Sequence, residues 1–318
     1  MKPACETVVV RLPNHVGDVC MALPALHLLA GAGLSPLLAG KRWAQSLLAG
    51  EGWDFVALDG HVWADAQRLR TAARAHGARR ALVLPNSMGS ALGCRLAGLS
   101  VAGLNTDARG WLLSVKVPAP HGAHEVERFF AAVQAALLGW GRGPVAEEPP
   151  ARLALKLTDA DRAAARATRK AAGVLERFAL LAPVARGTHR GQPKHWPHFK
   201  VLPDALAARG LRAVAAPPAD EAMATAAALP GATLLPPLAL GVFAALAADA
   251  ALVVANDSGT SHVAAAVGAP QVTLVGVTDP ARTGPWSGAA TVVGRDGAWP
   301  TVEEVLAAVD GRLASRVR

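Results

Sequence analysis

The sequence predicts an α/β protein with two doubly wound domains, whose parallel sheets face a central cleft. Short runs rich in Val and Leu alternate with longer helical patterns rich in Ala, Leu and Arg, as expected for strands that helices cover on both faces. A segment rich in Pro and Gly, Gly139–Pro150, separates two such series. The length of 318 residues and the 52% hydrophobic content suffice for about two cores. We therefore place the domains at residues 1–155 and 156–318.

The first series begins with a strand at Thr7–Arg11 and a helix at Met21–Ala32. It continues with a strand at Ala81–Leu84 and a helix at Ser90–Ala97. Because Leu alternates with other residues in Arg152–Leu157, we expect a further strand there, before the chain enters the second domain.

The second series predicts strands at Ala179–Ala182, Leu211–Ala215 and Ala251–Ala255. The apolar stretch Leu238–Ala255 approaches membrane-spanning length, but it holds Asp249 and becomes Val-rich near its end, which favours a helix followed by a strand. The last predicted element is an amphipathic helix at about residues 302–316, a candidate for packing back on the N-terminal domain.

The charge balance favours anionic partners. Lys and Arg outnumber Asp and Glu by 32 to 24, a net charge of +8. Nucleotides, phosphorylated glycans, nucleic acid and acidic membrane surfaces all fit this excess. Because the basic residues are scattered and form no long runs, we do not expect nucleic acid as a partner.

The cysteines and the N-terminus predict a cytoplasmic protein. Cys5, Cys20 and Cys94 have neither metal-ligand spacing nor a pairing pattern, which suits a reducing compartment. Charged residues such as Glu6 and Asp18 interrupt the N-terminal segment before the apolar region of a signal peptide could form.

The first candidate motif follows the first strand, in the segment Arg11–Asp18. Gly17 permits a tight turn, and Asp18 stands near a helix start at the predicted cleft. Asp is also favoured as a helix cap, so a structural role is an equal alternative for the motif alone. Neither a Gly-x-Gly-x-x-Gly fingerprint nor a Gly-x-x-x-x-Gly-Lys loop is present, which removes the main support for a dehydrogenase or a P-loop enzyme.

The second candidate is the polar, basic segment Arg186–Trp196, directly after a predicted strand. Arg186, Arg190 and Lys194 carry charge that suits phosphate oxygens, and Gly187 lets the backbone bend. The alternative is a solvated basic loop.

The third and strongest candidate is Asn256–His262, between a predicted strand and a helix. A helix N-terminus offers unpaired N–H groups and the positive end of the helix dipole, which together suit a diphosphate. In the alternative, the Asp and Ser are ordinary caps and the His is a surface residue. The residues that we expect to bind are Asp257, Ser258, Gly259, Thr260 and His262.

Two further clusters are less specific. His121–Glu125 carries two histidines, but Arg128 stands where the second His of a His-Glu-x-x-His zinc motif would be, so we predict no metal site. Asn86 and Ser87 follow a predicted strand and direct polar groups to the same cleft, and a simple turn is the alternative.

Taken in order, six segments resemble the ADP-heptose:lipopolysaccharide heptosyltransferases, a family of inverting glycosyltransferases with the GT-B fold of two Rossmann-like domains. The Pro-Asn-x-x-Gly-Asp and Leu-Pro-Asn-Ser forms are more similar to heptosyltransferase II than to heptosyltransferase I. The segments are Arg11–Asp18, Leu84–Ser87 with Ser90–Leu92, His124–Arg128, Pro193–Pro197, Asn256–Gly259 with His262–Ala266, and Thr278–Pro280 with Arg282–Trp286.

The resemblance implies a role for each matching position. Asp18 matches the catalytic base, and Lys194 matches a lysine that contacts the donor phosphates. Leu238 falls where the family has an apolar contact to adenine. We expect Asn14, Asn86 and Ser87 to bind the acceptor, and we expect the reaction to need no metal or cofactor.

The resemblance also implies the reaction and its partners. It implies transfer of a heptose from ADP-L-glycero-D-manno-heptose to the lipopolysaccharide inner core. The protein would be cytoplasmic, with its N-terminal domain in peripheral contact with the anionic inner membrane. The loop before Lys194 departs from the family pattern, so a different donor or acceptor within the family stays open. A non-catalytic sugar-nucleotide-binding protein is the alternative from another class.

Overall fold

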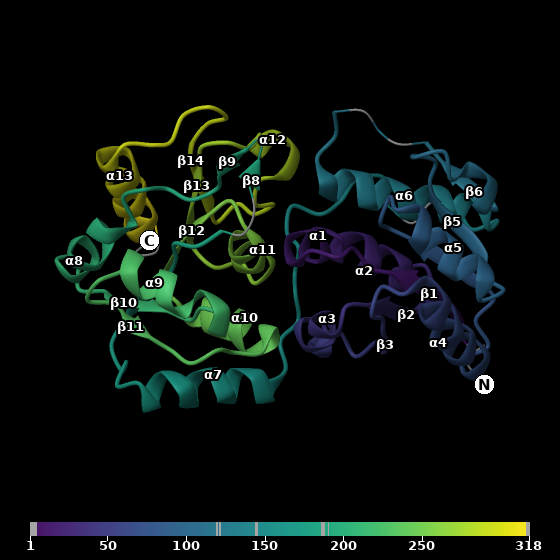
Figure 1. Cartoon of the computed structure of the whole chain (residues 1–318), viewed down its shortest axis with the longest axis horizontal. Coiled ribbons are helices and arrows are strands. Elements are labelled where there is room, and N and C mark those ends of the chain that lie inside the picture. Colours follow the sequence, from purple (N-terminus) through teal and green to yellow (C-terminus); the bar gives the residue numbers. More distant parts are fainter. Residues whose placement is uncertain are drawn as a thin grey trace. The chain divides into compact units, whose positions relative to one another are not determined.

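The computed structural model describes residues 5–118, 120, 122–143, 146–185, 188, 189 and 191–315. The chain forms two compact units, Met1–Pro150 and Ala151–Arg318. Within the described residues each unit contains a six-stranded parallel sheet with helices between successive strands (Figure 1). The predicted α/β class with two doubly wound domains is confirmed.

The sheet of the first unit has the strand order β3-β2-β1-β4-β5-β6. Its strands are β1 (Glu6–Arg11), β2 (Leu34–Gly40), β3 (Asp54–Ala57), β4 (Arg80–Val83), β5 (Ser100–Leu104) and β6 (Val115–Val117). The helices are α1 (Val16–Met21), α2 (Leu23–Gly31), α3 (Arg42–Leu47), α4 (Val62–Ala75), α5 (Met88–Leu96) and α6 (Glu125–Gly139), with 3-10 turns η1 (Ala49–Glu51) and η2 (Gly110–Leu112).

The central strand β1 is buried on both faces of the sheet, as its sequence predicts. Val8, Val9 and Val10 are all fully buried, because helices cover both faces. On the face of Val9, the core includes side chains from α4 and α5. Helices α2 and α6 pack on each other, and they contact β2, β5 and β6. The single helix expected at Met21–Ala32 begins earlier and is divided into α1 and α2, with Pro24 in the first turn of α2, where no amide hydrogen is needed.

The second sheet has the order β11-β10-β7-β12-β13-β14. Its strands are β7 (Phe178–Ala182), β10 (Arg212–Ala215), β11 (Thr233–Leu234), β12 (Leu252–Asn256), β13 (Gln271–Val275) and β14 (Ala290–Gly294), and a separate hairpin pairs β8 (Thr188–His189) with β9 (Gln192–Pro193). The helices are α7 (Asp159–Ala171), α8 (Leu202–Ala207), α9 (Ala222–Ala228), α10 (Leu240–Asp249), α11 (Gly259–Ala266), α12 (Pro280–Thr283) and α13 (Val302–Ala314), with 3-10 turns η3 (Phe199–Val201) and η4 (Ala219–Glu221).

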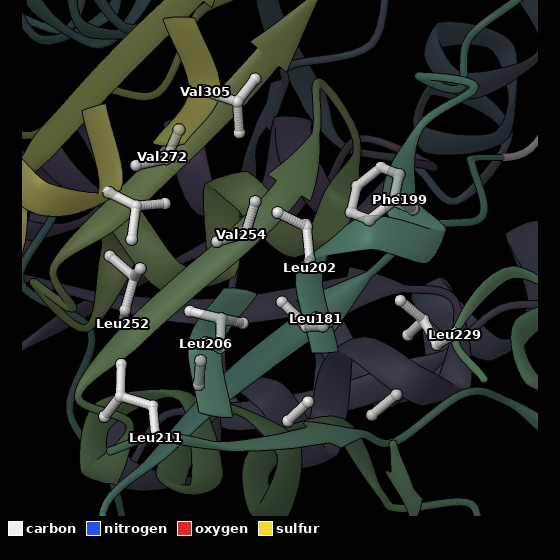
Figure 2. Packing of buried hydrophobic residues seen from close by; sticks show 14 of the residues in the cluster. Leu181, Phe199, Leu202, Leu206, Leu211, Leu229, Leu252, Val254, Val272 and Val305 are labelled. Carbon is white, nitrogen blue, oxygen red and sulfur yellow. The ribbon is translucent and has the colours of Figure 1, made fainter. Parts of the chain in front are cut away.

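Two hydrophobic layers enclose the second sheet. One layer joins the sheet to η3, α8 and α13, and its packing around Leu202, Val254 and Val305 is visible in Figure 2. The other layer joins the sheet to α7, α10 and α11. Helix α13, which the sequence left as a candidate for packing on the first domain, contacts β12, β13 and β14 and buries Val305 and Val309 in the second core.

The strand expected at Arg152–Leu157 is not present, and that prediction was wrong. This segment belongs to the second unit, where Leu153 is buried and the amide of Leu155 donates to the carbonyl of Ala266 at the end of α11, at 2.9 Å. Ala154 has a φ of +58°, which interrupts the extended backbone. The alternating Leu pattern therefore reflects packing beside a helix end, not pairing in a sheet.

No helix within the described ranges combines the length and the apolar character needed to cross a bilayer. The apolar stretch at Leu238–Ala255 is divided between α10 and β12, as predicted.

Asn256 ties the end of β12 to two other segments of the second unit. Its side chain is fully buried. Its Oδ1 accepts a hydrogen bond from the amide of Trp196 at 2.9 Å, and its Nδ2 donates to the carbonyl of Pro183 at 2.7 Å. One side-chain amide thus connects three chain segments at the carboxyl end of the central strands.

We predict that Asn256→Ala lowers the free energy of unfolding by about 2 to 4 kcal/mol, because it leaves the Trp196 N–H and the Pro183 carbonyl unpaired in a buried site. Urea unfolding followed by circular dichroism measures the change. Asn105→Ala, at an exposed position of the first unit, is the matched control and should change stability by less than about 0.5 kcal/mol. Equal effects of the two substitutions would contradict the assignment.

Candidate functional site

Asp18 lies in the first turn of α1, beyond the carboxyl end of β1. Its side chain is 36% exposed, and Oδ2 lies 3.3 Å from Nδ1 of His15, which is 85% exposed. His15, and not Asp18, occupies the N-cap position, and no side chain caps this helix. The helix-cap alternative for Asp18 therefore does not describe its position, although a carboxylate there still benefits from the helix dipole.

Asn14 is held in place by a buried arginine. Arg11, at the end of β1, is only 6% exposed. Its guanidinium donates to the carbonyl of Leu12 and, at 2.8 Å, to Oδ1 of Asn14. Burial lowers the pKa of Arg11. The Asn14 side chain is consequently fixed at the exposed end of the strand.

Ser87 and Asn86 follow β4 and differ in their bonding. The Ser87 hydroxyl accepts from the amide of Ser90 at 3.4 Å and caps α5, so Ser87 has a structural role whether or not it also binds a ligand. Asn86 carries a buried Oδ1 that has no hydrogen-bond partner among the described residues. Asn86 therefore retains an acceptor for a ligand or water.

Arg109 supports the loop that carries Asn86 and Ser87, and sequence reasoning did not identify it. It is fully buried, donates to the carbonyls of Pro85, Ser87 (3.4 Å) and Leu104 (3.0 Å), and has a pKa lowered by burial. Its partners lie up to 24 positions away in the sequence, and no local motif marks it.

In the second unit, Ser258 stands at the N-cap of α11, yet its side chain makes no capping hydrogen bond. Its buried Oγ has no partner among the described residues. The first amides of α11, at Gly259 and Thr260, follow directly. Because no side chain caps them, the N-terminus of α11 retains its capacity to bind an anion.

Asp257 is also not a helix cap. Its Oδ2 accepts from the hydroxyl of Thr278 at 2.6 Å, and its backbone amide donates to the carbonyl of Leu274 at 3.0 Å. Its Oδ1 lies 3.8 Å from Nε2 of His262, close enough for an ion pair when the imidazole is protonated. His262 is buried, which contradicts the alternative of a surface histidine. The structure thus brings Asp257 and His262 of the Asn256–His262 segment together with Thr278, which follows β13.

Lys194 follows β9 and is half-buried. Two residues further, the amide of Trp196 bonds to Asn256, so residues 194–196 approach the end of β12. Arg186, Gly187 and Arg190, predicted to accompany Lys194, lie outside the described residues. Leu238 precedes α10 and packs, half-buried, against the second hydrophobic layer of the sheet.

His124 has a structural role. It is the N-cap of α6, where its Nδ1 accepts from the amide of Val126 at 3.2 Å and its own amide donates to Glu127 at 2.7 Å. In the described part of the chain, no group of three His, Cys, Asp or Glu side chains is arranged to hold a metal ion. His121 is not among the described residues.

Comparisons with known proteins agree with this architecture. Residues 66–307 match the family model of glycosyltransferase family 9 (heptosyltransferase). Lipopolysaccharide heptosyltransferase 1 of Pseudomonas aeruginosa is 35% identical over 109 residues, which cover 32% of this chain. The match spans only 31% of that relative's length.

Solved structures match the fold over nearly the whole chain. The structure of E. coli ADP-heptose lps heptosyltransferase II has a TM-score of 0.80 and 23% identity, covering 98% of this chain and 100% of that chain. A glycosyl transferase family 9 structure from Veillonella parvula has a TM-score of 0.82 and 17% identity, covering 99% of each chain. With the family model matching most of its length, this chain belongs to glycosyltransferase family 9, the heptosyltransferase family.

Proposed function

We propose that this glycosyltransferase moves a heptose from ADP-L-glycero-D-manno-heptose to the lipopolysaccharide inner core, with the specificity of heptosyltransferase II. The observation that carries the proposal is the uncapped N-terminus of α11, flanked by Asp257 and His262. A helix end of this kind binds a diphosphate through backbone amides. The similarity in fold to an E. coli ADP-heptose lps heptosyltransferase II supports the choice of donor.

The donor half of the reaction needs positive charge where the diphosphate leaves. As the bond between the anomeric carbon and ADP breaks, negative charge grows on the phosphate oxygens. The amides of Gly259 and Thr260, the hydroxyl of Ser258 and the ammonium of Lys194 are the groups that we assign to this charge. His262 donates a further hydrogen bond, and Leu238 contacts the adenine. The proposal assigns no step to a metal ion or cofactor.

The acceptor half needs a base. Asp18 accepts the proton of the acceptor hydroxyl as its oxygen forms a bond to the anomeric carbon, opposite the leaving ADP. The configuration of that carbon is inverted, and the products are the glycoside and ADP. Its partial exposure leaves the Asp18 carboxylate accessible, and His15 lies beside it. Asn14, Asn86 and Ser87 bind acceptor hydroxyls through their polar side chains.

We predict that Asp18→Asn lowers transfer by about 10²- to 10⁴-fold, because the amide cannot accept the proton, while ADP binding is retained. The assay supplies ADP-heptose with two acceptors, lipopolysaccharide without heptose and lipopolysaccharide with one heptose. Wild type should prefer the second acceptor. Asp54→Asn, at an exposed carboxylate of the same unit, is the control and should keep activity.

Near-normal turnover by Asp18→Asn would overturn the base assignment. If wild type preferred the acceptor without heptose, the proposed specificity would be that of heptosyltransferase I and not that of heptosyltransferase II. The absence of any transfer by wild type, with ADP-heptose still bound, would favour the non-catalytic alternative, and transfer from another nucleotide-sugar would change the donor.

Calorimetry tests the donor site separately. We predict that wild type binds ADP more tightly than UDP or GDP, and that Lys194→Ala weakens ADP binding by about tenfold or more, since a charged hydrogen bond to phosphate is lost. Lys200→Ala, at an exposed lysine of η3, is the matched control and should leave the affinity unchanged. Equal ADP affinity of wild type and Lys194→Ala would refute the role of Lys194.

We also propose peripheral contact of the first unit with the anionic face of the inner membrane. Trp63, in the first turn of α4, is 74% exposed, and Trp111, in η2, is 72% exposed. Both follow strands of the first sheet at their carboxyl ends. Tryptophan is favoured at membrane interfaces, and the net charge of +8 adds attraction to anionic lipids.

Vesicle sedimentation tests this contact. At low salt, wild type should bind vesicles that contain phosphatidylglycerol, and Trp63→Ala with Trp111→Ala should lower the bound fraction several-fold, because the interfacial side chains are removed. Met223→Ala, an 88% exposed apolar residue of the second unit, is the control. A bound fraction that the double substitution leaves unchanged would contradict the assignment.

A further inference from the structure

The first unit contains a cavity of about 140 Å³ at the carboxyl ends of its strands. Because one water takes about 30 Å³ in the liquid, the cavity has room for a small polyatomic group. It is formed by the end of β1, the segment after β2, the β3–α4 connection and the start of α5. Its polar lining consists of Arg11, Asn14, Lys41, Asp65, Ser87 and Ser90.

Arg11 is a buried charge that makes no direct ion pair with another described residue, although the carboxylate of Asp65 in the same cavity favours its charged form. Its guanidinium donates hydrogen bonds to the Leu12 carbonyl and the Asn14 amide oxygen, both uncharged acceptors. The thiol of Cys94 lies nearby, but burial raises the pKa of Cys94 to about 12, so it stays neutral. Burial of an unpaired charge is costly, and an anion in the cavity would offset that cost.

The carboxylate of Asp65 raises the pKa of Arg11, but its own hydrogen bonds and its nearest arginine lie elsewhere. Its two oxygens accept hydrogen bonds from the backbone amides of Asp59 and Gly60, at 3.0 and 2.9 Å. Oδ1 is also 3.7 Å from a nitrogen of Arg68. Asp65 therefore holds the turn before α4, and its carboxylate also forms an ion pair with Arg68.

The remaining polar lining consists of groups that can donate hydrogen bonds. Lys41 donates to the carbonyl of Asp59 at 3.2 Å, and an ammonium has three donors in all. The hydroxyls of Ser87 and Ser90 lie 2.7 Å apart at the start of α5. Gly89 is without a side chain, and a Cβ there would come within 3.3 Å of Val62. Two cations and two hydroxyls thus line one cavity, together with the carboxylate of Asp65.

We propose that this cavity binds an oxyanion carried by the acceptor, a phosphate or a carboxylate group, through Arg11, Lys41 and the hydroxyl of Ser90. The inference rests on the proposed function, since it takes the first unit as the acceptor-binding unit. The planar guanidinium of Arg11 suits two oxygens of such a group. Arg11 ends β1 and Asp18 lies in the first turn of α1, so recognition of acceptor charge and proton removal would be carried by one segment of the chain.

Titration calorimetry of the full chain with inorganic phosphate, and separately with acetate, tests the site at low ionic strength. Wild type should bind at least one of these anions, and the stronger one identifies the type of group. Lys41→Gln should weaken its binding by about tenfold, because a charge-assisted hydrogen bond is lost. Arg11→Lys should have a similar effect, because it keeps the positive charge but loses the planar guanidinium that can donate to two oxygens at once.

Lys116→Gln is the matched control, an exposed lysine of β6 in the same unit, and it should bind the anion as wild type does. Thermal unfolding of each variant checks the fold. If Arg11→Lys does not fold, Lys41→Gln decides alone. No binding of either anion by wild type, or equal binding by Lys41→Gln, would overturn the proposal.

Two further measurements separate this inference from the proposed function. ADP binding by Lys41→Gln should equal that of wild type, because the donor site lies in the second unit. The bound anion should inhibit transfer competitively against the acceptor and not against the donor. Inhibition that is non-competitive with the acceptor would show that the oxyanion does not belong to the acceptor. The proposed function would still stand if ADP binding and heptose transfer were normal.

Discussion

The hydrogen bonds of Asn256 hold the end of β12 to the segments at Pro183 and Trp196. Within the Asn-Asp-Ser-Gly segment, neighbouring residues therefore have different tasks. Asn256 faces the interior and connects the chain, while Asp257 is engaged by Thr278, and Ser258 retains an unbonded hydroxyl. The uncapped start of α11 can face a ligand because these connections fix the loop without using the amides of Gly259 and Thr260.

Much of the fold was predictable because buried parallel strands have a simple signature. Each Val- and Leu-rich run named from the sequence, except one, became a strand within a residue or two of the expected limits. The exception, Arg152–Leu157, has the right alternation, but alternation records which side chains are buried and not what the backbone pairs with. Leu155 pairs with the end of a helix, and nothing local distinguishes that partner from a strand.

The candidate site was predictable in its local parts and not in its long-range contacts. Asp18 and the Asn256–His262 loop follow strands, and that position alone marks them. The partners of Asn256 lie 60 and 73 positions away, and Arg109 acts on a loop 22 to 24 positions before it. Such contacts depend on how distant segments meet. The family match begins at residue 66, so it does not include Arg11 or Asp18, and the role of Asp18 depends on the resemblance of the Arg11–Asp18 segment and on the position of its carboxylate.

The uncapped helix start of α11 also links the stability of the second unit to ligand binding. A ligand that binds only the folded protein stabilises it by about 2.7 kcal/mol at 100 times its dissociation constant. Natural capping by Ser would have stabilised the free helix by about 1 kcal/mol, and Ser258 does not provide it. The free second unit is less stable for lack of that cap, and a bound anion restores the difference. Under this linkage, an anion bound at the start of α11 would raise the free energy of unfolding of the second unit.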